Sequence, residues 1–167
     1  TGQSICILSF NRPEWVIADL ACMMIGGVPA GIYETCSPEE VAYIIGHSEA
    51  PIVIVEDPAQ WEKINAERKN LPNLRTVIIL DGADTVDDPL VMSWADFLAK
   101  SEETAEEIVD ERLAALEGDA CGTYIYTSGT TGPPKAVMLS HDNLAWTALA
   151  ARELVTLDGT DCSLSYL

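Results

Sequence analysis

The sequence predicts an α/β fold with an open, mostly parallel sheet flanked by helices. Short apolar runs occur at 5–10, 28–33, 51–55 and 76–80, and the last two are rich in β-branched residues, as is typical of parallel strands buried on both faces. Segments with a helical pattern separate these runs, so strand and helix alternate along the chain. With 48% hydrophobic residues, the 167-residue chain is able to bury the core of one ordinary domain.

Three helix starts are visible in the sequence. The segment 11–14, N-R-P-E, combines a candidate Asn11 cap with a proline and an acid in the first turn, and predicts a buried helix that ends at Gly26-Gly27. The segment 37–40, S-P-E-E, predicts a second helix by the same signals. Ser140 is the expected cap of a third helix, which is amphipathic.

Composition excludes several classes of protein. Nine basic residues against 27 acidic residues give a formal net charge of -18. Surfaces that bind nucleic acid need clustered lysine and arginine, so we expect no nucleic-acid partner. No apolar run approaches the roughly 20 residues of a transmembrane helix. The five cysteines include no C-x-x-C pair, and we expect reduced thiols in the cytoplasm.

Residues 81–119 are the most acidic part of the chain, with 13 of its 27 acidic residues and only two basic ones. A run of this kind is most often a solvated face, so we expect acidic surface helices outside the core. The spacing of the acids lacks the glycine and the ligand positions of an EF-hand loop.

The segment 124–137, YIYTSGTTGPPKAV, predicts the chemistry of the site. Its loop at 127–132 offers four hydroxyls, two glycines and consecutive backbone N–H groups, which together are able to surround an anion. The proline pair at 133–134 disfavours a helix after the loop, and Lys135 adds a positive charge. We therefore expect a phosphate-binding loop with a strand on each side.

Two other phosphate loops do not match this segment. A Walker A loop has its lysine directly after a glycine and a hydroxyl directly after the lysine, whereas here Pro134 precedes Lys135 and Ala136 follows it. The dinucleotide pattern G-x-G-x-x-G is also absent. A plain turn of small residues is the alternative, but the order Y-T-S-G-T-T-G-x-P-K is too long and too specific for chance.

That order resembles the phosphate-binding signature of the adenylate-forming enzymes, which include acyl-CoA synthetases, peptide-synthetase adenylation domains and luciferases. The resemblance extends to N-R-P-E-W, to G-G-V-P-A-G-I-Y-E-T-C-S-P-E-E-V-A-Y-I-I and to V-M-L-S-H-D-N, and points to the bubblegum-type long-chain fatty acyl-CoA synthetases. It implies that residues 1–167 are part of the large N-terminal AMP-binding domain of such an enzyme, and that the small C-terminal domain is absent.

The resemblance also implies a two-step reaction for the parent protein. A fatty-acid carboxylate attacks the α-phosphate of ATP to give acyl-adenylate and pyrophosphate, and coenzyme A then displaces AMP. ATP, Mg²⁺ and coenzyme A are thus implied, with a fatty acid and ATP as small-molecule partners. Peripheral contact with an intracellular membrane stays open, and the fragment alone is expected to be inactive.

The same resemblance implies the roles of individual residues. Lys135 would be catalytic, because its charge would neutralise the departing pyrophosphate, and Thr130 would help to hold the metal ion. The residues implied to bind the nucleotide are Thr127, Ser128, Gly129, Thr130, Thr131, Gly132, Pro133, Pro134 and Lys135.

Several points stay open at this level. Ala136 stands where the family has glycine after the lysine, and would be strained in a left-handed backbone. His47 is expected near a helix end, in contact with the helix dipole, and His141 in a cap region, so neither is assigned to catalysis. The alternative functions are an acid:thiol ligase for another carboxylate, and a truncated, non-catalytic structural or interaction module.

Overall fold

The computed structural model describes residues 2–127, 132–155 and 160–162. They form a seven-stranded sheet with the order β5-β4-β3-β1-β2-β6-β7. Its strands are β1 (Ser4–Leu8), β2 (Val28–Ile32), β3 (Ile52–Val55), β4 (Thr76–Ile79), β5 (Val91–Ser93), β6 (Cys121–Thr127) and β7 (Lys135–Ser140). Neighbouring strands from β5 to β6 are parallel, and β7 is antiparallel to β6. The predicted α/β fold with a mostly parallel sheet is confirmed.

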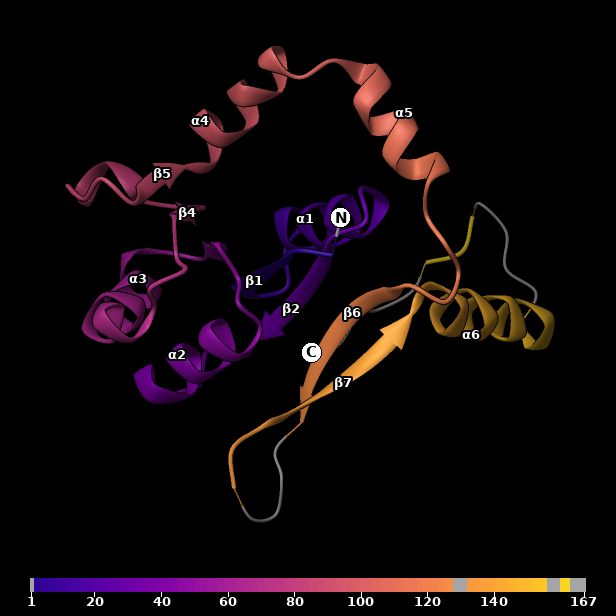
Figure 1. Cartoon of the computed structure of the whole chain (residues 1–167), viewed down its shortest axis with the longest axis horizontal. Helices are drawn as coiled ribbons and strands as arrows, with labels where there is room; N and C mark the ends of the chain where they lie inside the picture. The colour runs from indigo at the N-terminus through magenta and orange to yellow at the C-terminus, as the bar shows by residue number, and fades with distance from the viewer. Residues whose placement is uncertain (1, 128–131, 156–159, 163–167) are drawn as a thin grey trace.

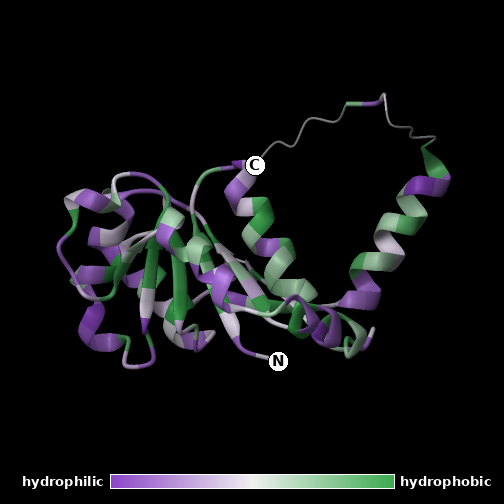
Figure 2. Ribbon diagram, turned by 90° about the horizontal axis from the view of Figure 1, so that it is seen from above, coloured by the Kyte–Doolittle hydropathy of each residue, from purple (hydrophilic) through white to green (hydrophobic). Residues whose placement is uncertain are grey.

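Helices cover both faces of the sheet (Figure 1). They are α1 (Pro13–Met24), α2 (Pro38–His47), α3 (Pro58–Ala66), α4 (Trp94–Ala99), α5 (Glu106–Ala114) and α6 (His141–Leu154), with short 3-10 turns at Arg68–Asn70, Ala83–Thr85 and Lys100–Glu103. α2 and α3 pack on one face, and α1 and α4 pack on the other. α6 follows β7 and projects away from the sheet (Figure 2).

The core lies in two layers, one on each face of the central strands. In β1, Cys6 and Leu8 face α2 and α3, whereas Ile7 faces α1. All three side chains are fully buried, because successive residues of a strand point to opposite faces and both faces are covered. Figure 2 shows the central strands as the most hydrophobic part of the ribbon.

Side chains of the predicted caps start two of the helices. The Ser37 hydroxyl accepts a hydrogen bond from the Glu40 backbone N–H at 3.2 Å, and the Glu40 carboxylate accepts one from the Ser37 N–H at 2.8 Å. Ser140 and Asn143 form the same reciprocal arrangement at the start of α6. Both starts are confirmed as capping boxes.

The predictions for α1 are partly wrong. The residue that precedes its first turn is Arg12 rather than Asn11, and the Arg12 side chain makes no capping hydrogen bond. The glycine stop is confirmed: Gly26 has φ +75°, and the N–H groups of Gly26 and Gly27 donate to the carbonyls of Met23 and Cys22. The helix is also not buried all round, since four apolar side chains on it are about half exposed: Val16, Ile17, Leu20 and Met24.

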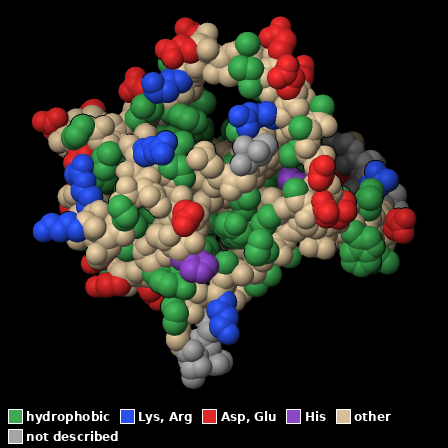
Figure 3. Space-filling model, in the orientation of Figure 1, with side chains coloured by type: hydrophobic (Ala, Val, Ile, Leu, Met, Phe, Trp, Pro, Cys, Tyr) green, Lys and Arg blue, Asp and Glu red, His purple; other side chains and the backbone are tan. Residues whose placement is uncertain are grey.

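The acidic segment 81–119 holds a strand that the sequence did not predict. β5 pairs in parallel with β4, and the α4 residues Trp94 and Phe97 pack against the core on the α1 face of the sheet. Acidic side chains line the outer arc made by α4 and α5 (Figure 3). The first part of the segment therefore completes the sheet, while α5 presents its acids to solvent.

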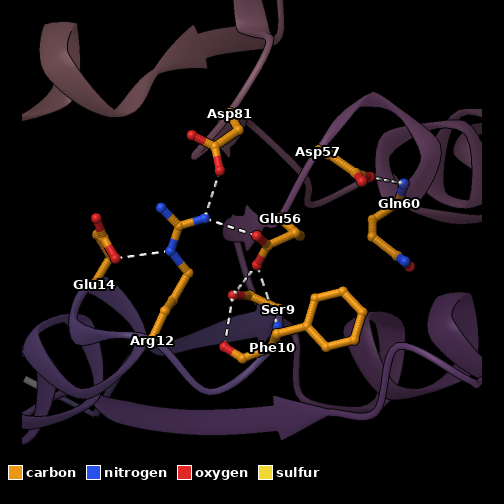
Figure 4. Close-up of polar contacts among 8 residues, drawn as sticks. All are labelled: Ser9, Phe10, Arg12, Glu14, Glu56, Asp57, Gln60 and Asp81. Carbon is orange, nitrogen blue, oxygen red and sulfur yellow. Dashed lines mark hydrogen bonds and ion pairs between the residues drawn. The ribbon is translucent and has the colours of Figure 1, made fainter.

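Arg12 joins the carboxyl ends of three parallel strands (Figure 4). Its guanidinium lies 2.7 Å from Glu14, from Glu56 after β3 and from Asp81 after β4. Glu56 also accepts hydrogen bonds from the Ser9 hydroxyl at 2.7 Å and from the Phe10 N–H at 3.2 Å. The hydrogen bonds to Glu14 and Asp81 raise the pKa of Arg12, so its guanidinium stays charged.

Glu56→Gln is expected to lower the free energy of unfolding by about 1–3 kcal/mol, because a hydrogen-bonded charge with little exposure is replaced by an amide. The matched control is Asp81→Asn, expected to cost only about 0–1 kcal/mol because that pair is exposed. The side chains are 15% and 67% exposed, respectively. Urea denaturation of the purified protein measures both values, and equal losses would contradict the expectation.

Stability is expected to fall between about pH 9 and pH 12. Burial raises the pKa of Cys6 from 9.0 to about 12, so over this range the unfolded chain has lost the thiol proton that the folded chain keeps. The free energy of unfolding therefore falls as pH rises, by at most about 1.4 kcal/mol per pH unit for one group. Cys6→Ala should make this dependence less steep in urea denaturation at a series of pH values.

The control for this experiment is Ile7→Val, in the same strand. It removes a buried methylene at a cost of about 0.5–1.5 kcal/mol and should leave the pH dependence unchanged, since it removes no titrating group. If the two variants gave the same slope against pH, the burial of the Cys6 thiol would not be its cause.

Candidate functional site

The predicted phosphate-binding segment lies at the tip of the β6–β7 hairpin, which projects away from the body of the molecule (Figure 1). Tyr126 pairs with Ala136, and Thr127 pairs with Lys135 as the last pair before the tip. Of the predicted site residues, the structure places Thr127, Gly132, Pro133, Pro134 and Lys135 here. Ser128, Gly129, Thr130 and Thr131 lie outside the described residues.

The structure brings Thr127 and Lys135 together at the ends of the two strands. The Thr127 hydroxyl donates to the Lys135 carbonyl at 3.5 Å, and both residues are exposed. Lys135 forms no ion pair with any residue in the described part of the chain. Its ammonium group is therefore free to meet an anion that approaches the tip.

Gly132 has a backbone conformation that L-residues rarely adopt. Its φ is +120°, and nothing lies within 4 Å of the position that a Cβ would occupy. The glycine is thus required by the backbone and not by crowding. After it come Pro133 and Pro134, and β7 begins directly at Lys135 with no helix, as the proline pair predicted.

Ala136 is not strained by its methyl group. It lies inside β7, and among the described residues Glu49 is the only non-glycine with positive φ. The Ala136 side chain is partly buried and packs against the core cluster of the α2–α3 face. The departure from the family pattern at this position therefore adds a small packing contact.

Tyr126 connects this hairpin to the core. Its side chain is 9% exposed, and its hydroxyl lies 2.8 Å from Nδ1 of His47, at the end of α2. Burial raises the pKa of Tyr126 to about 12, so the phenol is neutral at physiological pH. His47 lies in the last turn of a helix as expected, but its contact with Tyr126 was not predicted.

His141 is the first residue of α6, in the predicted cap region. Its backbone N–H donates to the Ala120 carbonyl at 3.1 Å, and its buried Nε2 has no hydrogen-bond partner among the described residues. The hydrogen bond to Ala120 joins the start of α6 to the residue before β6.

A cavity of about 750 Å³ lies between β6 and α1. Burial raises the pKa of the Asp19 carboxyl on its wall. The sequence did not predict this cavity, because its walls come from segments far apart in the chain. Its lining includes Phe10, Trp15, Asp19, Tyr33, Glu34 and Ile125.

Two kinds of feature are absent from the described residues. They hold no group of three His, Cys, Asp or Glu side chains that could bind a metal ion. None of their helices combines the length and the apolar character needed to cross a membrane.

Comparison with known proteins identifies the family. The profile described as AMP-binding enzyme matches residues 1–167, the whole chain. The chain belongs to the AMP-binding enzyme family. The resemblance inferred from the Y-T-S-G-T-T-G-x-P-K order is thereby confirmed.

Curated relatives refine this membership. The chain is 41% identical over 162 residues to the long-chain-fatty-acid–CoA ligase ACSBG2 of Gallus gallus, covering 95% of this chain and 21% of that protein. It is also 41% identical over 147 residues to the long-chain-fatty-acid–CoA ligase ACSBG1 of Bos taurus, covering 88% and 20%. The chain thus spans about one fifth of the length of these relatives.

Solved structures agree on the fold. The apo structure of MbtA from Mycobacterium smegmatis superposes with a TM-score of 0.77 at 21% identity, over 95% of this chain and 28% of that one. At this level of identity the likeness supports the α/β fold of the family and nothing finer.

Gly132→Ala is expected to weaken ATP binding by roughly 5- to 30-fold, because holding an L-residue at this φ costs of order 1–2 kcal/mol and the tip would relax out of its geometry. Isothermal titration calorimetry with the purified protein measures the change. The control is Gly46→Ala in α2, where a Cβ would lie 3.9 Å from Leu71 Cδ2 and ATP binding should not change. Equal affinities in the wild type and Gly132→Ala would show that binding does not need this conformation.

Proposed function

We propose that the protein to which this chain belongs activates a long-chain fatty acid to its acyl-CoA at the expense of ATP. The observation that supports this most directly is at the hairpin tip, where the exposed Gly132 with positive φ lies near Lys135, a cation that has no ion pair among the described residues. The curated relatives named as long-chain-fatty-acid–CoA ligases support the substrate class.

The proposed chemistry has two steps. A carboxylate oxygen of the fatty acid attacks the α-phosphorus of ATP, which forms the acyl–phosphate bond and breaks the bond to pyrophosphate. The coenzyme A thiolate then attacks the acyl carbon, which forms the thioester and releases AMP. Charge accumulates on the departing pyrophosphate in the first step, so a fixed positive group there lowers the barrier.

Each residue of the tip has a proposed role in this reaction. Lys135 would place its ammonium group against the phosphates, and the segment 127–132 would bind them through hydroxyls and backbone N–H groups. The pairing of Thr127 with Lys135 supports this assignment, because it places the start of the segment beside the lysine. The prolines at 133 and 134 would fix the direction in which the chain leaves the tip.

Magnesium is proposed as the metal, with Thr130 as its ligand from this segment. Mg²⁺ supplies charge neutralisation at the phosphates when bound, and it is commonly held by substrate phosphates, water and one or two protein oxygens.

We also propose a cytoplasmic location. The five cysteines are all free, and free thiols are typical of reducing compartments. Peripheral contact with an intracellular membrane follows from the family resemblance alone and stays a prediction.

Lys135→Ala is expected to lower ATP–pyrophosphate exchange, dependent on a long-chain fatty acid, by about 10²–10³-fold, because a charge at the developing pyrophosphate is lost. The assay uses the full-length protein, and the control is Lys100→Ala, which removes an exposed lysine in the acidic segment far from the tip.

Three outcomes of this assay have different meanings. Exchange that depends on fatty acid and is lost only in Lys135→Ala supports the proposal. Exchange that depends on a short or aromatic carboxylate would show that the substrate belongs to that class and is not a long-chain fatty acid. The absence of exchange with any carboxylate would favour a non-catalytic module.

A further inference from the structure

Near its tip, the β6–β7 hairpin contacts the core through Tyr126 and through the partly buried Ala136. Near the tip, Thr127 and Lys135 are exposed, and the neighbouring side chains Ile125 and Val137 are 47% and 43% exposed. Tyr126, at 9% exposed, is the buried member of this group. Its partner across the hairpin is Ala136, the residue next to Lys135.

His47 contacts Tyr126 in two ways. Nδ1 of His47 lies 2.8 Å from the phenol oxygen, and the two rings meet edge to face with centroids 5.7 Å apart at 81°. The imidazole also stacks on Tyr43, with centroids 5.4 Å apart at 25°. His47 is therefore held in one orientation between two aromatic rings.

The helix that carries His47 is a firm support. α2 begins with a capping box and buries four of its residues in the core: Val41, Ala42, Ile44 and Ile45. Directly after His47, Ser48 joins the helix end to β1, because its carbonyl accepts a hydrogen bond from Ser4 and its hydroxyl lies 3.3 Å from the Cys6 sulfur. A group fixed at this point is fixed relative to the centre of the sheet.

We propose that His47 is a positioning residue for Lys135, acting through Tyr126. The histidine holds the Tyr126 ring against α2, the Tyr126 backbone pairs with Ala136, and Ala136 sets the place of the adjacent Lys135. Loss of the His47–Tyr126 hydrogen bond leaves the rest of the fold in place and lets the exposed end of the hairpin move. This inference rests on the proposed role of Lys135 in phosphate binding.

The test is a double-mutant cycle in the full-length protein, with His47→Phe, Tyr126→Phe and the double variant. Each single change keeps an aromatic ring and removes one partner of the hydrogen bond, and should raise KM for ATP about fivefold. Because both changes break the same bond, the double variant should also show about a fivefold increase. KM for the fatty acid should stay unchanged, which a general loss of structure would not produce.

Two further variants sharpen the result. His47→Gln keeps a side chain that is able to hydrogen-bond the phenol and should recover most of the ATP affinity. Tyr124→Phe is the matched control, since it removes a hydroxyl from the same strand two residues earlier, and should not change KM for ATP. A roughly 25-fold effect in the double variant, equal changes in both KM values, or no change in the single variants would each overturn the proposal.

A second measurement separates this inference from the proposed function. Amide hydrogen exchange at residues 135–137 should be faster in Tyr126→Phe than in the wild type, whether or not ATP is the substrate. One result would be that the wild type shows no ATP–pyrophosphate exchange while these amides exchange hydrogen faster in the variant. The proposed reaction would then be wrong, but the positioning contact would be supported. If the amides keep their wild-type rates, the contact does not hold the hairpin and the inference fails.

Discussion

The structure depends on the burial of β1 at the centre of the sheet. This strand has β2 on one side and β3 on the other, and its side chains point alternately into two different cores. Because both faces of this strand are buried, the chain supplies helices to both faces of the sheet, and the crossovers from β1 to β2 and from β3 to β4 each return to a neighbouring parallel strand. The same arrangement gathers the carboxyl ends of β1, β3 and β4 at one edge, where Arg12 joins three carboxylates.

Much of the fold could be predicted from the sequence, because its strongest signals are local. The caps at Ser37 and Ser140 and the glycine stop at Gly26 use residues within a few positions of one another. Apart from the cap of α1, which is Arg12 and not Asn11, the features that were missed are non-local. The ion pairs of Arg12 were not predicted, because its partner Glu56 is 44 residues away. β5 was not predicted either, because it is a three-residue strand in an acidic segment and pairs only with the edge of β4.

The candidate site divides in the same way. The order of residues from Thr127 to Lys135 predicts a phosphate-binding segment without any structure, since glycine, hydroxyl and lysine lie within nine positions. What supports that segment could not be predicted, because His47 and Tyr126 are 79 residues apart and meet only when α2 packs on the sheet. Apolar periodicity also overstated the burial of α1, since a sequence pattern reports hydrophobicity and not which side chains find a neighbour.

The acidic arc of α4 and α5 has an electrostatic consequence for a polyanion such as ATP. The arc belongs to residues 81–119, whose 13 acidic and two basic residues supply -11 of the net charge of -18, and it lies across the molecule from the projecting hairpin (Figures 1 and 3). Ions in physiological solution screen charges over about 8 Å, so the repulsion fades within a short distance of the arc while the cation at the tip acts at contact. The arc therefore keeps a polyanion away from its own surface without opposing the phosphate binding that we propose at Lys135.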